Sequence, residues 1–242
     1  MERRLELGIS LRGVSKAFGP QLALNRIDLD ISVGSYVAVM GSNGAGKTTL
    51  LKVISGLAVP TRGSVTIAGI EMRRAGPRLR ARVGIVGHES MLYPDLTGRE
   101  NLVFHARLFG LEHPGAAAER TAGLLGIDGV LDRTVRTLSR GTRQRMALAR
   151  ALLHDPTVIL FDEPFTGLDE AAALSLSGIL EELNTPERVL IVTLHDVSRA
   201  LSGPQRLLVL SSGRIVLDTP THLPGEDVAE TYLGLLRSEA GR

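Results

Sequence analysis

A glycine-rich segment in the first quarter of the chain carries the residue types needed to hold phosphate groups. It reads Gly41-Ser42-Asn43-Gly44-Ala45-Gly46-Lys47-Thr48 and matches the pattern G-x-x-x-x-G-K-[ST] in full. Gly44 and Gly46 let backbone N–H groups surround a phosphate without a Cβ in the way. Lys47 adds a positive charge, and Thr48 offers a hydroxyl to Mg²⁺. The segment therefore predicts a loop that binds the phosphates of a nucleotide.

Two adjacent carboxylates form the second chemical feature. Asp162 and Glu163 directly follow the apolar run Val158–Phe161, which is typical of a buried strand. At the tip of that strand Asp162 can hold the water shell of Mg²⁺. Glu163 points elsewhere and can orient or deprotonate an attacking water. A kinase, a GTPase or a transport ATPase could carry such a loop, but the guanine-reading pattern N-K-x-D of GTPases is absent from the sequence.

These residues need strands and helices that bring them together. The phosphate loop lies between an apolar strand, Tyr36–Met40, and a helix, Lys47–Ser55. Farther along, the helix-like segment Glu170–Leu183 separates the apolar strands Val158–Phe161 and Val189–Leu194, and this spacing of strand, helix and strand indicates parallel βαβ units. Further predicted strands are Leu5–Leu11, Ile27–Ile31, Ser64–Ala68, Val83–Val86, Val189–Leu194, Arg206–Leu210 and Arg214–Leu217. Further predicted helices are Arg99–Gly126 with a break at His113-Pro114-Gly115, Arg140–Leu153, Glu170–Leu183 and Val228–Ser238.

Composition excludes several other classes of protein. The 242 residues contain no cysteine, which rules out disulfides, thiolate metal sites and cysteine nucleophiles. The formal charge of +2 gives no polybasic signature, and a content of only 3% aromatic residues argues against a base-stacking surface. No apolar run is longer than a strand, so we expect neither a signal peptide nor a membrane anchor. An arginine-rich segment could bind phosphate but is expected to be a solvated face: Arg73, Arg74, Arg78, Arg80 and Arg82.

The order of the motifs resembles that of the ATP-binding cassette (ABC) ATPases from about Phe18 to Asp218. Leu138–Thr142 resembles the family signature, with Arg140 and Thr142 in place of the usual glycine and glutamine. Phe165–Asp169 resembles the D-loop of the family. The resemblance implies an α/β fold: a P-loop NTPase (RecA-like) core, an N-terminal antiparallel β subdomain and an inserted helical signature subdomain. Residues 1–242 would form one nucleotide-binding domain, with the helical subdomain at about 89–153 and a C-terminal helix at about 226–238.

The resemblance also implies a role for each motif residue, with ATP and Mg²⁺ as cofactors. The catalytic residues would be Glu163, His195 and Lys47, and the metal ligands Thr48 and Asp162. His195 would contact the γ-phosphate, and Phe18 would stack on adenine. His88 stands where most members have a glutamine that touches Mg²⁺ and the attacking water. The nucleotide contacts would be Phe18, Gly41, Ser42, Asn43, Gly44, Ala45, Gly46, Lys47, Thr48, Thr49, His88, Ser139, Gly141 and Asp169.

In this family, two cassettes enclose two ATP molecules between the phosphate loop of one and the signature of the other. Ser139 and Gly141 would therefore serve the ATP of a second copy of the chain. Integral membrane permease subunits would be the other partners and would bind the substrate, with no direct contact to nucleic acid. The resemblance thus implies a peripheral location at the cytoplasmic face of the cell membrane.

Local sequence is similar to one branch of the family, the ATP-binding subunit of the Ccm-type haem exporter of cytochrome c biogenesis. The similar segments are Gly87-His88-Glu89, Leu92–Thr97, Glu100–Leu102, Ser139–Gly141 and Gln144-Arg145. No residue is expected to bind haem, because His105 and His113 are interpreted as surface or packing histidines. The alternatives are the ATPase of another exporter or importer (of a drug, lipid or polysaccharide) and a soluble ATPase acting on ribosomes or DNA. A binding module without turnover would be expected to lack Glu163 or His195.

Overall fold

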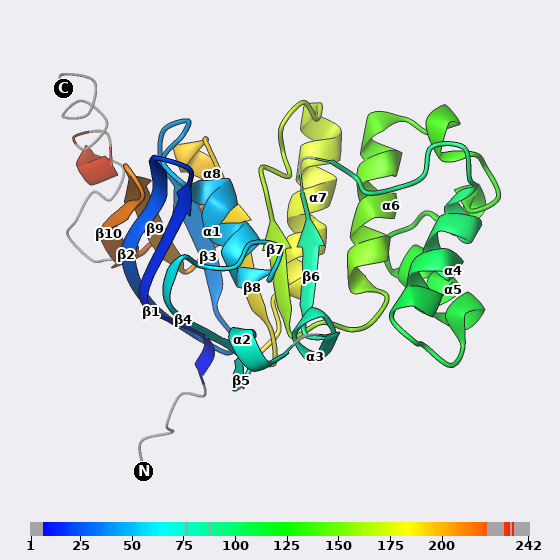
Figure 1. Ribbon diagram of the computed structural model, residues 1–242. Coiled ribbons are helices and arrows are strands. Elements are labelled where there is room, and N and C mark those ends of the chain that lie inside the picture. Colours follow the sequence, from blue (N-terminus) through cyan, green and yellow to red (C-terminus); the bar gives the residue numbers. More distant parts are fainter. Residues whose placement is uncertain (1–6, 76, 88, 222–229, 233, 235–242) are drawn as a thin grey trace, which may run out of the picture.

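A six-stranded sheet lies across the middle of the molecule (Figure 1). The computed structural model describes residues 7–75, 77–87, 89–221, 230–232 and 234. The strand order is β10-β9-β3-β8-β7-β6, and only the pairing of β10 with β9 is antiparallel. Every residue of β3, β7 and β8 is buried. Both faces of these strands are covered, which explains their uninterrupted apolar sequences. The strands are β3 (Tyr36–Met40), β6 (Val83–Val86), β7 (Val158–Phe161), β8 (Val189–Thr193), β9 (Arg206–Ser211) and β10 (Arg214–Pro220).

A second sheet, antiparallel and four-stranded, lies at the side of the molecule where the strands are blue and cyan in Figure 1. Its order is β2-β1-β4-β5. Buried side chains of this sheet, of helix α1 and of the six-stranded sheet form one hydrophobic core. The elements are β1 (Leu7–Phe18), β2 (Gln21–Ser32), β4 (Arg62–Ile67), β5 (Ile70–Glu71) and α1 (Lys47–Ile54).

Helices α4, α5 and α6 form a group at the opposite side of the molecule (Figure 1). A second hydrophobic core joins this group to α7 and to the six-stranded sheet. The helices are α4 (Gly98–Leu108), α5 (Pro114–Leu124), α6 (Arg140–Leu152) and α7 (Glu170–Leu183). Shorter helices are α2 (Met72–Ala75), α3 (Pro77–Arg80), α8 (Val197–Leu201) and the 3₁₀ turns η1 (Asp128–Val130) and η2 (Val135–Thr137).

The structure confirms most of the predicted elements and corrects the bounds of several, among them the second strand, which begins at Gln21 instead of Ile27. The first strand runs on to Phe18, well beyond the predicted end at Leu11. The predicted helix break is confirmed at His113, but it ends there, because Pro114 is already the first residue of α5. Proline suits the first helical position, where its missing N–H has no helical partner. Of the predicted C-terminal helix, residues 230–232 and 234 are helical and the others lie outside the described residues.

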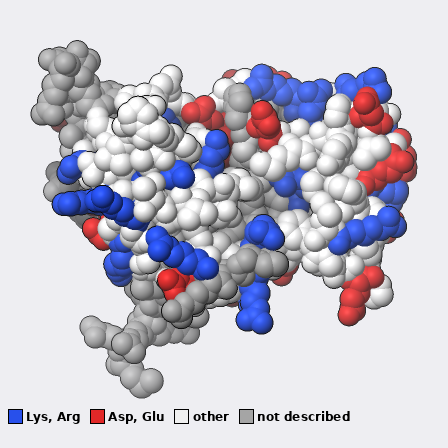
Figure 2. Space-filling view, in the orientation of Figure 1, with Lys and Arg blue, Asp and Glu red and all other residues white. Residues whose placement is uncertain are grey.

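The surface agrees with the small net charge. Figure 2 shows basic and acidic side chains mixed over the visible face, with uncharged areas between them. Four members of the arginine-rich segment are exposed, as a solvated face predicts: Arg73, Arg78, Arg80 and Arg82. The side chain of Arg74 lies outside the described residues. Within the part of the chain that the structure describes, none of the helices combines the length and apolarity needed to cross a membrane.

Candidate functional site

The phosphate loop connects the buried strand β3 to the first turn of α1. Gly41, Gly44 and Gly46 have φ angles of 146°, 82° and 110°, which side chains rarely adopt. A Cβ at Gly46 would lie 2.6 Å from the carbonyl oxygen of Ala23, whereas one at Gly44 would meet no atom within 4 Å. The space beside Gly44 is therefore open. The free N–H groups of the first turn of α1 point out of the N-terminal end of this helix, where the loop joins it. Such a loop fits an anionic phosphate group.

Lys47 is held against the loop that precedes it. Its Nζ donates hydrogen bonds to the carbonyl oxygens of Gly41 (2.8 Å) and Ser42 (3.2 Å). Only 5% of the residue is exposed. Burial lowers the pKa of the Lys47 ammonium, and the negative charges of Glu163 and Asp162 oppose that shift. The ammonium group of Lys47 thus contacts the loop and interacts with the carboxylates of Glu163 and Asp162.

Asp162 lies at the end of β7 and faces the first turn of α1. Its Oδ1 accepts hydrogen bonds from the hydroxyls of Thr48 (3.2 Å) and Thr193 (2.9 Å). One carboxylate and one hydroxyl from different elements are the oxygen donors that Mg²⁺ prefers, with the remaining positions taken by phosphate and water. No cluster of three or more metal-binding side chains occurs among the described residues. The hydroxyl of Thr48 and the carboxylate of Asp162 are a donor set that fits Mg²⁺ bound jointly with a nucleotide.

Glu163 and His195 meet where the neighbouring strands β7 and β8 end. The Nε2 of His195 lies 2.6 Å from Oε1 of Glu163. Glu163 has a φ angle of 53°, in the left-handed region, which is uncommon for a residue with a side chain. A quarter of the Glu163 side chain and 45% of the His195 side chain remain exposed. The pair can therefore reach a water molecule or a ligand at the surface of the site.

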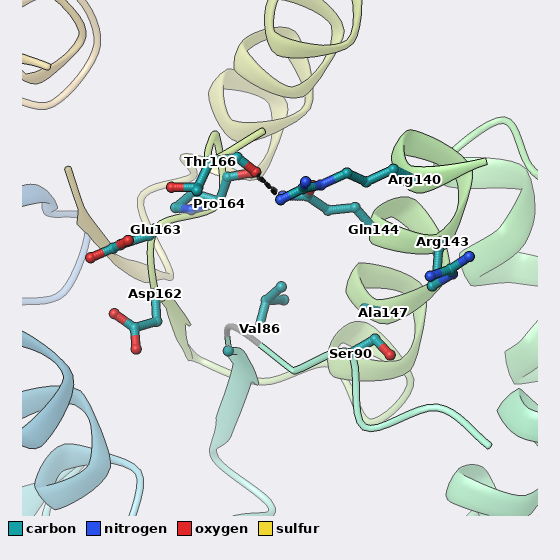
Figure 3. A pocket seen from close by; sticks show the side chains of 11 residues that line it. Val86, Ser90, Arg140, Arg143, Gln144, Ala147, Asp162, Glu163, Pro164 and Thr166 are labelled. Atoms are coloured by element: carbon teal, nitrogen blue, oxygen red, sulfur yellow. Dashed lines mark hydrogen bonds between the residues drawn. The ribbon is translucent and has the colours of Figure 1, made fainter. Parts of the chain in front are cut away.

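A cavity of about 370 Å³ separates the end of β7 from α6 (Figure 3). Figure 3 shows the carboxylates of Asp162 and Glu163 pointing away from α6, while Arg140 and Gln144 reach across from it. The guanidinium of Arg140 donates a hydrogen bond to the carbonyl oxygen of Thr166 (2.6 Å). The side-chain amide of Gln144 donates to the carbonyl oxygen of Pro164. These contacts connect the signature helix directly to the segment that follows Glu163.

The signature residues lie apart from the phosphate loop of their own chain. Ser139 is the N-cap of α6, as predicted, and its hydroxyl accepts a hydrogen bond from the N–H of Thr142 (3.2 Å). Ser139 and Gly141 line a separate cavity of about 350 Å³ together with Leu168. Strands β6 and β7 lie between α6 and α1 in Figure 1. The structure thus brings Lys47, Thr48, Asp162, Glu163 and His195 together, but not Ser139 and Gly141 with them.

The other predicted contact residues lie around these two groups. Phe18 ends β1 and is half exposed, with Nζ of Lys16 4.8 Å from its ring centre. The carboxylate of Asp169 caps α7 by accepting the N–H of Ala172 (2.8 Å). His88 lies outside the described residues. The remaining loop residues are Ser42, Asn43, Ala45 and Thr49, whose predicted nucleotide contacts stay predictions.

Two residues of this site were not predicted from the sequence. Thr193, the last residue of β8, hydrogen-bonds Asp162 and the backbone of Glu163. Its signal was a single hydroxyl in an otherwise apolar strand, two residues before His195. Arg140 was noted only as a departure from the signature, and its contact with Thr166 depends on tertiary packing that no local pattern shows.

Similarity to known proteins extends over most of the chain. The family model described as ABC transporter matches residues 24–166. The chain is 35% identical to an ATP-binding protein of Brucella abortus (strain 2308), over 86% of the chain and 60% of that protein. The chain therefore spans less than two thirds of the length of this relative.

Other relatives are covered more completely. The chain is 36% identical to the Nod factor export ATP-binding protein I of Burkholderia orbicola, over 93% of the chain and 76% of that protein. It is 37% identical to an aliphatic sulfonates import ATP-binding protein of Paraburkholderia xenovorans, over 90% of the chain and 83% of that protein. The dimeric, post-hydrolysis structure of an ATP-binding cassette with ADP and Pi superposes with a TM-score of 0.80 at 28% identity, covering 89% of this chain and 99% of that one.

Proposed function

The chain belongs to the ABC transporter family, and we propose that it is the ATP-hydrolysing subunit that powers a membrane transporter. ATP-binding cassettes hydrolyse ATP to drive transport. The fold is that of such a cassette, with an antiparallel β subdomain beside a P-loop NTPase core. The observation that carries the proposal is the 2.6 Å contact between Glu163 and His195 at the same strand ends as the phosphate loop.

The side chains divide the proposed reaction between them. Backbone N–H groups of the loop and the ammonium of Lys47 hold the phosphates and offset their negative charge. Glu163 accepts a proton from the attacking water, and His195 orients the Glu163 carboxylate through the hydrogen bond to Oε1. Thr48 and Asp162 would hold Mg²⁺, which supplies charge stabilisation to the phosphate oxygens. The protein therefore contributes mainly positioning and electrostatic stabilisation.

Steady-state ATPase measurements on the wild type and on Glu163→Gln test this proposal. The amide keeps the size of the side chain but cannot accept the proton, so we expect turnover to fall by about 10²–10⁴-fold. ATP binding should persist, and Glu163→Gln with ATP should accumulate as a dimer. An unchanged turnover in Glu163→Gln would show that Glu163 is not the base. A wild type without any ATPase activity, alone or with membranes, would contradict the proposed function itself.

A second copy of the chain is the first proposed partner. Ser139 and Gly141 line a cavity that contains neither Asp162 nor Glu163, which supports a site that a second chain would complete. A symmetric dimer would place each signature over the phosphate loop of the other chain. The similar solved structure with ADP and Pi is described as dimeric, which supports this arrangement.

Membrane permease subunits are the second proposed partner, and a groove between β6 and α6 is the proposed contact. The groove measures about 150 Å³, and Leu57, Met91 and Phe109 line its apolar part. Arg150 lines it too, donating to the carbonyl oxygen of Ile85 (2.7 Å) without a carboxylate partner among the described residues. Burial lowers the pKa of Arg150 to about 10. The groove therefore fits a permease segment with an apolar side chain and a carboxylate, at the cytoplasmic face of the membrane.

Leu57→Asp and Met91→Asp test the groove, because both side chains are more than 40% exposed and tolerate a charge without unfolding the core. We expect each variant to lose co-purification with membrane proteins and to keep its ATPase activity in the absence of membranes. Leu174→Asp, on the exposed side of α7, is the matched control and should keep both properties. Retained co-purification in both groove variants would place the permease contact elsewhere.

For the cargo, the proposal is haem, exported for cytochrome c biogenesis. It rests on local sequence alone, namely Gly87-His88 and the signature Ser139-Arg140-Gly141 with Gln144-Arg145. His105 packs against Tyr93 and Phe104 and its Nε2 lies 3.2 Å from the carbonyl oxygen of Met91, which supports its interpretation as a packing histidine. The relatives named above export Nod factor or import sulfonates, so the alternative is the ATPase of another exporter or importer.

The ATP-trapped Glu163→Gln dimer can identify the cargo route. We would purify it from gently solubilised native membranes and identify its partners by mass spectrometry. Haem-handling permease subunits would support the haem proposal, and a different permease would replace the cargo while keeping the ATPase mechanism. Recovery of ribosomal or DNA-bound partners without any membrane protein would contradict a role in transport.

A further inference from the structure

Thr193 is a buried polar side chain in a strand that is otherwise apolar. It is the last residue of β8, none of it is exposed, and the four residues before it are Val189, Leu190, Ile191 and Val192. Burying a hydroxyl is unfavourable unless it forms hydrogen bonds. Thr193 lies between the ends of β7 and β3, the two strands that lead to Asp162 and to the phosphate loop. A valine would suit the packing of this strand equally well, so the hydroxyl needs an explanation.

The hydrogen bonds of this hydroxyl have a defined direction. The backbone N–H of Glu163 donates to Oγ1 of Thr193 at 2.7 Å, so Oγ1 is the acceptor there. The single hydroxyl proton is then free to be donated to Oδ1 of Asp162 at 2.9 Å. The carbonyl oxygen of Phe161 is a poorer acceptor at 3.5 Å. One side chain thus contacts both acidic residues of the site at once.

The contact with Glu163 bears on an unfavourable backbone conformation. Glu163 has a φ angle of 53°, which costs on the order of the energy of a hydrogen bond for a residue with a side chain. Such a conformation persists only where the surroundings hold it. Thr193 binds the Glu163 N–H, and His195 binds its carboxylate. Without the Thr193 hydroxyl, the N–H of Glu163 would lose its hydrogen-bond acceptor. The left-handed conformation of Glu163 would then lose the contact that restrains its backbone.

We propose that Thr193 is a positioning residue for ATP hydrolysis, which fixes the position of the Asp162 carboxylate relative to the backbone of Glu163. The proposal rests on the ATP hydrolysis proposed above. Through Asp162 the hydroxyl orients the oxygen that also accepts the hydrogen bond of Thr48. By accepting the N–H of Glu163, it fixes the backbone from which the proposed proton-accepting side chain extends. Thr193 itself does not touch the reacting atoms.

The test compares Thr193→Val, which has the same shape without the hydroxyl, with Thr193→Ser, which keeps the hydroxyl. For Thr193→Val we expect kcat to fall by about 10-fold to 100-fold, because small displacements of catalytic groups have effects of that size. The Mg²⁺ concentration that gives half-maximal activity should rise, while the affinity for ATP measured without turnover changes by less than about threefold. Thr193→Ser should recover most of the lost kcat. A purely structural role would lower thermal stability without shifting the Mg²⁺ dependence.

A double-mutant cycle with Glu163→Gln provides the second readout. If Thr193 acts through Glu163, then Thr193→Val in the Glu163→Gln background should lower kcat by much less than in the wild type. Should Thr193→Val fail to fold, Thr193→Cys keeps a similar size with a weaker donor and should show an intermediate kcat. Wild-type kcat and Mg²⁺ dependence in a folded Thr193→Val or Thr193→Cys would overturn the proposal. An inactive wild type would instead overturn the proposed ATPase function.

Discussion

The Nε2 of His195 lies 2.6 Å from Oε1 of Glu163, and this hydrogen bond joins the ends of the adjacent strands β8 and β7. Both residues follow strands whose positions are set by buried, parallel pairing, Phe161 opposite Val192. The strands therefore hold the two side chains close to each other. Glu163 is restrained at its carboxylate by His195 and at its backbone by Thr193. This double restraint is the basis of the first prediction.

His195→Ala should lower ATP turnover by about 10²-fold or more, because the Glu163 carboxylate, which we propose accepts the proton, loses the group that orients it. If His195 acts through Glu163, the losses will not add: the double variant with Glu163→Gln should be within about threefold of the slower single variant. Single-turnover ATPase assays with saturating ATP measure both effects. Losses that multiply in the double variant would indicate two independent roles.

Gly46→Ala should abolish nucleotide binding, and Gly44→Ala should only weaken it. Both residues have positive φ angles, so both substitutions carry a backbone cost of about 1–3 kcal/mol. Only at Gly46 does the added Cβ also approach a backbone atom, 2.6 Å from the carbonyl oxygen of Ala23. Titration with a fluorescent ATP analogue and a thermal melt of each variant measure the difference. Equal effects of the two substitutions would show that contacts with β2 do not shape the loop.

A mixture of two inactive variants should regain activity if the signature serves the partner chain. Lys47→Ala removes the phosphate-loop charge, and Ser139→Arg blocks the signature. In a mixed dimer one composite site combines both defects, while the other contains wild-type Lys47 and Ser139. With random pairing and independent sites, about a quarter of wild-type activity should return, as expected of a two-fold symmetric pair. Each variant alone is the control, and a mixture that stays inactive would argue for a site completed within one chain.

Much of the site was predictable because its parts are local in sequence. The phosphate loop has a dense pattern, and β3, β7 and β8 are uninterrupted apolar runs because both faces of the sheet are covered. The carboxyl ends of parallel strands share one edge of the sheet, so Asp162 and Glu163 had to lie near the strand end before His195. Pattern and topology together were sufficient for this part of the site.

The remaining features depend on tertiary contacts. Thr193 reads as an ordinary β-branched strand residue until Asp162 and the Glu163 N–H are found within hydrogen-bond distance. Arg140 reads as an exposed arginine until its contact with Thr166 is seen. The segment Asp95-Leu96-Thr97-Gly98 matches the short pattern D-x-x-G, which also occurs in GTPases, yet Thr97 caps α4 together with Glu100 in a reciprocal pair. A short pattern could not distinguish a phosphate contact from a helix cap.

Stability should fall as the pH drops below about 6.5, with His154 as a main cause. Its ring stacks on Phe109 at 3.8 Å, its Nε2 lies 3.2 Å from the carbonyl oxygen of Val83, and its Nδ1 is buried without a partner among the described residues. Burial lowers the pKa of His154 below its usual 6.5, and burial lowers that of His105 as well. Below about pH 6.5 the histidines of the unfolded chain bind protons that the buried histidines of the folded chain do not. The contribution of the neutral, buried histidines to stability is therefore complete above about pH 6.5 and is lost as the pH falls through their lowered pKa.

His154→Gln tests this pH dependence by removing the titrating group. Urea denaturation at pH values from about 8 down to 5 should show a shallower loss of unfolding free energy for His154→Gln than for the wild type, because one of the two histidines no longer contributes. The variant should also be less stable at the upper end of this range, since the amide does not replace the ring stacked on Phe109. His113→Gln, at an exposed position before α5, is the matched control and should follow the wild-type curve. Parallel curves for the wild type and His154→Gln would mean that the buried ring is not the group whose protonation destabilises the fold.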